Sequence, residues 1–149
     1  MYHNILVPVD GSPPSSHGLD EAVRLAAALG ARIRLLHVVN ELVVLTPEVA
    51  ATALTDVLDM LRTQGQQILK EAETAVSRAG VPVEIGLVEA MGGHAGDHVV
   101  QKAQEWPADL IVCGTHGRRG LRRALLGSDA EHIVRNSPVP VLLVRAEKT

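Results

Sequence analysis

The chain has 149 residues, of which 46% are hydrophobic and 21% are charged, and this composition is that of an ordinary globular protein. We expect residues 1–149 to form a single domain with an aliphatic core, because the sequence has no Phe, one Trp and one Tyr. The net charge of −3 and the scarcity of aromatic side chains argue against nucleic acid as a partner. No run reaches the roughly 18 apolar residues of a membrane span. Tyr2–Val9 is too short an apolar run for a signal sequence, so we expect a cytoplasmic protein without membrane contact.

Strand and helix patterns alternate along the chain. Short apolar runs rich in β-branched residues predict strands at Ile5–Val9, Ile33–Val39, Val83–Val88, Asp109–Cys113 and Pro138–Val144. Apolar residues at helical spacing predict helices between them, over about residues 13–29, 54–79, 95–105 and 128–135. This alternation is typical of an α/β protein. We expect an open, twisted, five-stranded parallel sheet of Rossmann-like type, with strand order 3-2-1-4-5 and helices on both faces.

Proline, serine and glycine mark the boundaries of these elements. Pro8 should stand at the end of the first strand, because proline cannot donate a hydrogen bond to a β ladder. Ser12 precedes two prolines, a pattern typical of a helix N-cap followed by the first helical residues. Gly30 is expected to end the first helix, and Gly65 is a candidate interruption of the second.

The most informative stretch runs from Ile111 to Ser128, where an apolar run stops at a glycine and three more glycines follow before a predicted helix. Glycines let backbone N–H groups approach a ligand, and a helix N-terminus adds free donors and a positive dipole end. The loop is therefore suited to a phosphate group. Ser128 and Glu131 have the S-x-x-E spacing of a capping box at the helix start. The glycines alone are equally compatible with a plain turn before a basic helical face, since Gly-rich loops are a weak motif.

The spacing within this stretch is more specific than its glycine content. Gly114, two residues, Gly117, nine residues, Gly127 and Ser128 match without gaps the G-x2-G-x9-G-[S/T] signature of the ATP-binding branch of the universal stress protein family. The resemblance extends over nearly the whole chain, through V-P-V-D-G-S at Val7–Ser12, L-L-H-V-V at Leu35–Val39 and S-P-V-P-V-L-L-V at Ser137–Val144. It implies an adenine nucleotide (ATP, ADP or AMP), accompanied by Mg²⁺, in the crevice between the first and fourth strands.

The resemblance also implies roles for individual positions. Asp10 corresponds to the family's acidic residue near the ribose and phosphates, and an N-cap of the first helix is its alternative role. Val38 corresponds to the position whose backbone reads the adenine edge. The phosphate loop corresponds to Gly114, His116, Gly117, Gly127, Ser128, Asp129 and Ala130. A solvent-facing side chain is the alternative for His116. One or two of the arginines that follow are expected to assist the phosphates: Arg118, Arg119, Arg122 and Arg123.

The other polar residues predict no catalytic or metal site. His94 and His98 lie four residues apart, which places two imidazoles on one helix face, but no third ligand is spaced nearby. We expect exposed helical histidines there. His37, inside the second strand, is expected to be a hydrogen-bonded structural histidine, and Cys113 a small core residue. The sequence has neither a Walker G-x-x-x-x-G-K-[ST] motif nor a G-x-S-x-G elbow, so we expect at most a weak ATPase.

Three functions follow from these patterns. The first is a dimeric, nucleotide-binding stress-response protein that signals its occupancy to an unidentified protein partner. The second is a small ATP-dependent ligase or adenylyl-transferring enzyme, against which stands the lack of a second domain for another substrate. The third is a purely structural dimer. The apolar last strand, Val139–Val144, is the expected homodimer contact, because an exposed sheet edge invites pairing with another chain and the resemblance implies the same strand.

Overall fold

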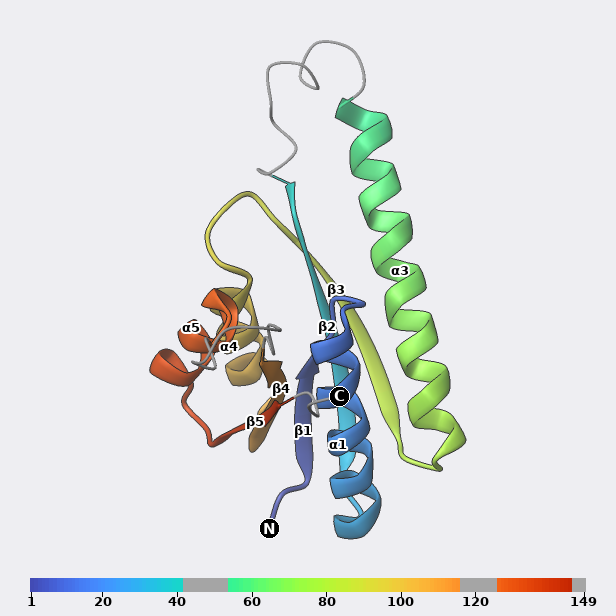
Figure 1. Cartoon of the computed structure of the whole chain (residues 1–149), viewed down its shortest axis with the longest axis vertical. Coiled ribbons are helices and arrows are strands. Elements are labelled where there is room, and N and C mark those ends of the chain that lie inside the picture. The colour runs from blue at the N-terminus through green and yellow to red at the C-terminus, as the bar shows by residue number, and fades with distance from the viewer. Residues whose placement is uncertain (42–53, 116–125, 146–149) are drawn as a thin grey trace.

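The computed structural model describes residues 1–41, 54–115 and 126–145, and strands alternate with helices throughout that part of the chain (Figure 1). The strands are β1 Asn4–Pro8, β2 Arg32–Asn40, β3 Val83–Ala90, β4 Leu110–Thr115 and β5 Val141–Arg145. They form a parallel sheet in the expected order β3-β2-β1-β4-β5. The helices of the described part are α1 Pro13–Leu29, α3 Leu54–Arg78, α4 Ala95–Glu105 and α5 Ser128–Asn136. The α/β class and the strand order predicted from the sequence are confirmed.

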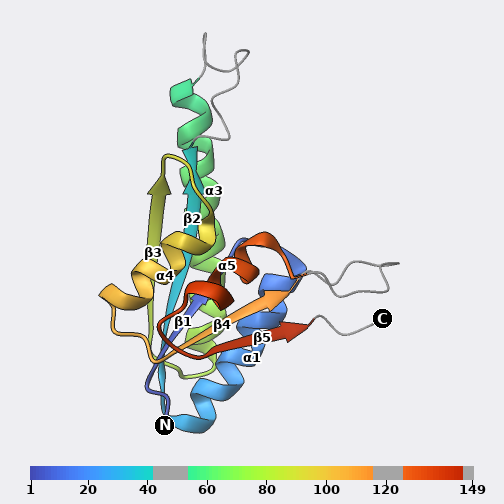
Figure 2. The same cartoon turned by 90° about the vertical axis from the view of Figure 1, so that its left-hand side faces the viewer.

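Helices cover both faces of the sheet, with α1 and α3 on one face and α4 and α5 on the other (Figure 2). Side chains of β1 alternate between the two layers: Ile5 and Val7 belong to the cluster under α1 and α3, and Leu6 to the cluster under α4 and α5. All three side chains are fully buried. A strand buried on both faces has no polar side, which is why the strands read as continuous apolar runs.

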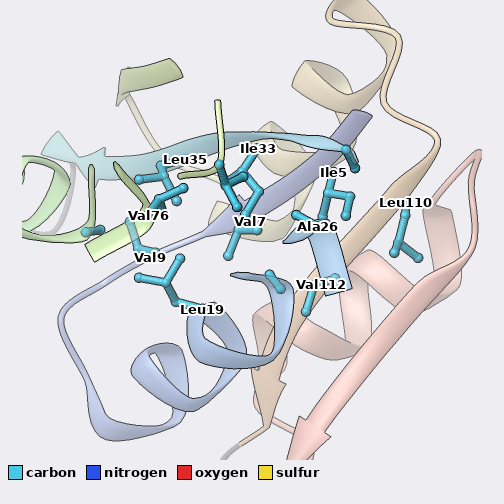
Figure 3. Packing of buried hydrophobic residues seen from close by; sticks show 14 of the residues in the cluster. Ile5, Val7, Val9, Leu19, Ala26, Ile33, Leu35, Val76, Leu110 and Val112 are labelled. Atoms are coloured by element: carbon cyan, nitrogen blue, oxygen red, sulfur yellow. The ribbon is translucent and has the colours of Figure 1, made fainter. Parts of the chain in front are cut away.

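The larger hydrophobic cluster lies between the sheet, α1 and α3 (Figure 3). Residues from β1, β2 and β4 pack there against one face of each helix, and the labelled members are Ile5, Val7, Val9, Leu19, Ala26, Ile33, Leu35, Val76, Leu110 and Val112. The second cluster contains the single tryptophan, Trp106, and Cys113. Because burying one aliphatic side chain contributes about 1.5–3 kcal/mol, packing of this kind holds the helices to the sheet.

Most of the predicted boundaries are confirmed, but the last strand begins at Val141 and not at Pro138, and the interruption expected at Gly65 is absent. Pro8 is the last residue of β1. The Ser12 side chain caps α1 by accepting a hydrogen bond from the Ser15 N–H, and Gly30 ends this helix in the left-handed conformation (φ 67°). Gly65 does not interrupt α3, which is continuous from Leu54 to Arg78.

Gly65 is instead a contact between α3 and the sheet. A Cβ at this position would lie 2.7 Å from Cδ2 of His37 and 2.9 Å from Cδ1 of Leu87. The glycine therefore lets the helix approach β2 and β3 closely, and the packing gain outweighs its poor helix propensity. Among the described residues, no helix is both long enough and apolar enough to cross a membrane.

Candidate functional site

A cleft opens at the carboxyl ends of β1 and β4, between which the strand order reverses. Such a reversal is where ligands bind in open parallel sheets. The cleft has a volume of about 690 Å³, including space open to solvent. Five segments far apart in sequence line it: residues 8–15, 36–38, 95–99, 113–114 and 127–133. The tertiary structure therefore assembles one concave site from the ends of β1, β2 and β4 and the starts of α4 and α5.

The cleft brings together most of the residues that the sequence analysis assigned to a nucleotide site. The predicted residues that line it are Asp10, Val38, Gly114, Gly127, Asp129 and Ala130. Ser128 lies between two of them and is exposed at the start of α5, outside the lining. His116, Gly117 and the four arginines of the predicted loop lie outside the described residues.

Asp10 stands in the turn that joins β1 to α1. Gly11 has a positive φ of 80°, which allows the chain to reverse directly after the strand. The Asp10 carboxylate accepts a hydrogen bond from the Ser12 N–H at 2.8 Å, and the Asp10 N–H donates to the Ser15 hydroxyl at 3.1 Å. Ser12, and not Asp10, is the N-cap of α1. The Asp10 side chain therefore orders the turn and remains exposed on the cleft wall.

Gly114 serves the packing of α1 against the end of β4. A Cβ at Gly114 would lie 1.9 Å from the carbonyl oxygen of Pro14. A Cβ at Gly18 would likewise lie 2.8 Å from the Gly114 nitrogen, so two glycines face each other across this contact. The sequence analysis assigned Gly114 to ligand access. The structure adds that the glycine brings the first turn of α1, and with it Asp10, up to β4.

The start of α5 lies where it was predicted, but the predicted capping box is wrong. Gly127 is the N-cap, with ψ near 155°, and no side chain caps the helix there. Ser128 is consequently the first helical residue and not the N-cap. Its hydroxyl therefore does not accept a hydrogen bond from the backbone amides of the first turn. Glu131 pairs with Arg135 at 2.7 Å instead. The first helical hydrogen bond joins the Glu131 N–H to the Gly127 carbonyl, so the amides of residues 128–130 have no carbonyl within the helix to bind.

The contribution of α4 to the site was missed by the sequence analysis. Ala95, Gly96 and Val99 line the cleft beside α5. The Gly96 N–H donates to Oδ1 of Asp129 at 3.3 Å, which joins the first turns of the two helices. The available sequence signal was the glycine pair Gly92-Gly93 before a predicted helix, since such a loop can present a helix N-terminus to a ligand.

Two other side chains at the cleft are structural, as expected. His37 Nδ1 lies 2.7 Å from the Val9 carbonyl oxygen, and an imidazole nitrogen at that distance donates to the carbonyl. This hydrogen bond fixes the strand end that leads into Asp10. Cys113 is 4% exposed, and burial raises the pKa of its thiol to about 11. The thiol is therefore protonated and weakly nucleophilic near neutral pH.

The predicted helical pair of His94 and His98 is corrected by the structure. His94 is the extended N-cap of α4, because the helix begins only at Ala95. Its ring stacks on His132 of α5 with 4.0 Å between ring centroids. His98 Nε2 lies 3.4 Å from the Gly92 carbonyl oxygen. Within residues 1–41, 54–115 and 126–145, no three His, Cys, Asp or Glu side chains are arranged to hold a metal ion.

Comparison with known proteins identifies the family. The sequence pattern of the universal stress protein family matches residues 1–145. A universal stress protein of Methanocaldococcus jannaschii is 32% identical over 151 residues, which cover 99% of this chain and 85% of the relative. The crystal structure of a universal stress protein family member from Burkholderia pseudomallei is 34% identical, has a TM-score of 0.80, and matches over 97% of both chains.

A further solved structure, a universal stress protein in complex with cAMP, is 28% identical and covers 98% of both chains with a TM-score of 0.67. Sequence and fold thus agree over nearly the full length of the chain. This protein belongs to the universal stress protein family.

Proposed function

We propose that this chain is a stress-response protein that binds an adenine nucleotide, ATP or AMP, in the cleft at the carboxyl ends of β1 and β4. The observation that carries the proposal is the convergence of Asp10, Gly114 and the first turn of α5 on one cleft. A related universal stress protein, 28% identical over 98% of this chain, forms a complex with cAMP. That ligand combines the adenine, ribose and phosphate groups that the cleft is proposed to hold.

The chemistry of the lining suits each part of such a ligand. Leu36, Val38 and Val99 provide apolar surface for the purine ring, and the Val38 backbone is the proposed partner of the adenine edge. The Asp10 carboxylate is an acceptor for ribose hydroxyls. The free amides at the start of α5 and the positive end of its dipole favour a phosphate.

Mg²⁺ fits this arrangement as a companion of the nucleotide. Mg²⁺ in nucleotide sites usually takes one or two protein ligands and completes its shell with phosphate oxygens and water, so a dedicated protein cage is unnecessary. The exposed Ser128 hydroxyl, at the start of α5, is the group that we assign to a water bound to the ion.

We propose that the protein acts as a binding and regulatory module, with at most slow ATP hydrolysis. His37 is engaged by the Val9 carbonyl, and the Cys113 thiol is buried and has a raised pKa. A buried, protonated thiol is not an activated nucleophile, and the His37 ring is oriented by a backbone carbonyl and not by a carboxylate. Nucleotide occupancy, rather than turnover, is the signal that a protein partner would read.

The proposed assembly is a homodimer through Val139–Val144. β5 is the last strand at one edge of the sheet and pairs with β4 on its inner side. Leu142 on this strand is 37% exposed. Pairing of two such edges across a two-fold axis would satisfy the outer backbone groups of β5 and cover this side chain.

Calorimetric titration with AMP, ATP·Mg²⁺ and GTP tests the nucleotide proposal. We expect saturable binding of an adenine nucleotide and weaker binding of GTP. Asp10→Ala should weaken binding about tenfold or more, because a hydrogen bond to a charged group contributes about 1.5–3 kcal/mol and about 1.4 kcal/mol is tenfold in affinity. Asp20→Ala is the matched control, since Asp20 lines the separate groove between α1 and α3. Absence of nucleotide binding, or equal affinity of Asp10→Ala and wild type, would contradict the proposal.

Two further measurements define the ligand and the chemistry. Denaturing freshly purified protein and separating the released nucleotides identifies whether ATP, ADP or AMP is bound. Assaying AMP and pyrophosphate release in the presence of candidate acceptors tests the ligase alternative. Release well above a slow ATPase background would favour that enzyme over a regulatory module.

Sedimentation of Leu142→Lys tests the dimer. A buried charge at the strand pair should shift the protein to monomer. Val134→Lys is the control, because Val134 is 44% exposed and belongs to α5 and not to β5. A Leu142→Lys variant that remains a dimer would place the interface elsewhere.

A further inference from the structure

Helix α4 begins without a side-chain cap of its own. Its N-cap residue, His94, is extended (φ −91°, ψ 141°) and makes no side-chain capping hydrogen bond. The first turn of any helix leaves backbone N–H groups that need an acceptor. Here Oδ1 of Asp129, from the neighbouring helix α5, lies 3.3 Å from the Gly96 N and accepts its hydrogen bond. The cap of α4 is thus supplied by α5.

The two helices meet too closely at this point for any residue but glycine. A Cβ on Gly96 would lie 2.7 Å from the Asp129 carbonyl oxygen and 2.8 Å from Cβ of His132. Asp129 and His132 are three residues apart and therefore face the same way on α5. His132 stacks on His94, and its Nδ1 lies 3.1 Å from Oδ1 of Asp97. We call His94, Gly96, Asp97, Asp129 and His132 the α4–α5 clasp.

The clasp adjoins the phosphate-binding end of the proposed site. Gly127, Asp129 and Ala130 line the cleft from α5, and Gly96 lines it from α4. The amides of residues 128–130, which are the proposed phosphate donors, belong to the same helical turn as the Asp129 carboxylate. The position of that carboxylate therefore fixes the orientation of those amides.

We infer that Asp129 is a positioning residue of this site: its carboxylate caps α4 and thereby holds the first turn of α5 in the orientation that binds the nucleotide phosphate. The inference rests on the proposed function and names a residue whose side chain acts through α4 and not on the ligand. It also explains how a carboxylate, which repels phosphate, is tolerated at this end of the cleft: one of its oxygens accepts the Gly96 N–H at the positive end of α4.

The sign of the mutational effect separates this role from a direct electrostatic one. Removing a negative charge near a phosphate strengthens phosphate binding if charge alone matters. Removing the carboxylate weakens phosphate binding if its function is to hold α5. The affinity for adenosine, which has no phosphate, should stay the same whether the carboxylate acts through its charge or through its hold on α5. The ratio of AMP affinity to adenosine affinity is therefore the informative quantity.

The experiment measures AMP and adenosine affinities by calorimetry for wild type, Asp129→Ala, Asp129→Asn and Glu131→Ala. Asp129→Ala should lower AMP affinity about three- to tenfold, the range of losing a helix-capping hydrogen bond, and leave adenosine affinity as in wild type. Asp129→Asn keeps the acceptor oxygen without the charge and should restore most of the AMP affinity. Glu131→Ala removes the other acidic side chain from the same turn of α5, but this one pairs with Arg135, so AMP affinity should not fall.

A ligand-free measurement supports the same test. Hydrogen exchange of the Gly96 amide should be faster in Asp129→Ala than in wild type and close to wild type in Asp129→Asn. Equal or tighter AMP binding by Asp129→Ala, with wild type binding AMP, would overturn the positioning role alone. Equal losses for AMP and adenosine would also overturn it, because they indicate general destabilisation. Wild type that binds neither AMP nor ATP would overturn the proposed function itself, and the inference with it.

Discussion

Replacing Gly114 by alanine tests how the fold builds the cleft. The added Cβ would lie 1.9 Å from the carbonyl oxygen and 2.4 Å from the carbonyl carbon of Pro14. Both atoms are backbone of the first turn of α1, so no side-chain rotation can relieve the clash. Overpacking a core costs about 1–3 kcal/mol, and a backbone shift belongs at the upper end, about 3 kcal/mol. Because about 1 kcal/mol shifts Tm by about 2–4 °C in a chain of this size, Gly114→Ala should melt about 6–12 °C below wild type.

The matched control is Gly86→Ala on β3. A Cβ there has its nearest neighbour, Cδ1 of Leu36, at 3.5 Å, which is an ordinary van der Waals contact. Removing glycine from a strand should leave stability unchanged or raise it by up to about 1 kcal/mol. Thermal melting followed by circular dichroism on nucleotide-free protein measures both variants. Unchanged melting of Gly114→Ala would refute the reasoning, because it would mean that α1 can move away from β4 without cost.

Three other changes test local packing. Gly65→Ala should lower the urea midpoint, although alanine is a better helix former than glycine by about 1 kcal/mol. The reason is that the new Cβ would lie 2.7 Å from Cδ2 of His37, and a higher urea midpoint would contradict the close approach of α3 to the sheet. Ser12→Ala removes the cap of α1 and should cost about 1 kcal/mol in urea unfolding; no loss would show that the cap is dispensable. Cys113, with a pKa of about 11, should react slowly with iodoacetamide near neutral pH and quickly in urea; equal rates would contradict its burial.

The fold was predictable because its strands carry an unambiguous local signal. The apolar runs around Leu6, Leu35 and Ile111 have no polar face, and this is the pattern of strands covered by helices on both sides. Ser12 and Gly30 act on adjacent backbone groups, so their capping roles could also be derived from neighbouring residues alone. The assignment of Asp10 to the cleft followed from the expected strand order, and that of Val38 followed from the resemblance to a known family.

Two of the wrong predictions, those for Gly65 and for His94, concern residues whose partners are distant in sequence. Gly65 reads locally as a weak point in a helix, but its role is set by His37 on the strand beneath it. Ser128 and Glu131 have capping-box spacing, but the chain enters α5 through Gly127 and makes the serine the first helical residue. His94 and His98 were interpreted as an isolated pair, because the stacking partner of His94 is thirty-eight positions away in α5.

The sequence by itself determined the elements of this protein and the family to which it belongs, because hydrophobic period, turn residues and motif spacing are local properties of the chain. The order of the strands was expected from the fold class and the family resemblance, and the tertiary structure confirmed it. Only the tertiary structure decided how the cleft is built. The contact of Gly114 with Pro14 and the cap that Asp129 provides to Gly96 join segments separated by tens of residues. Such contacts depend on how closely two backbones approach, and no local pattern of residues specifies that distance.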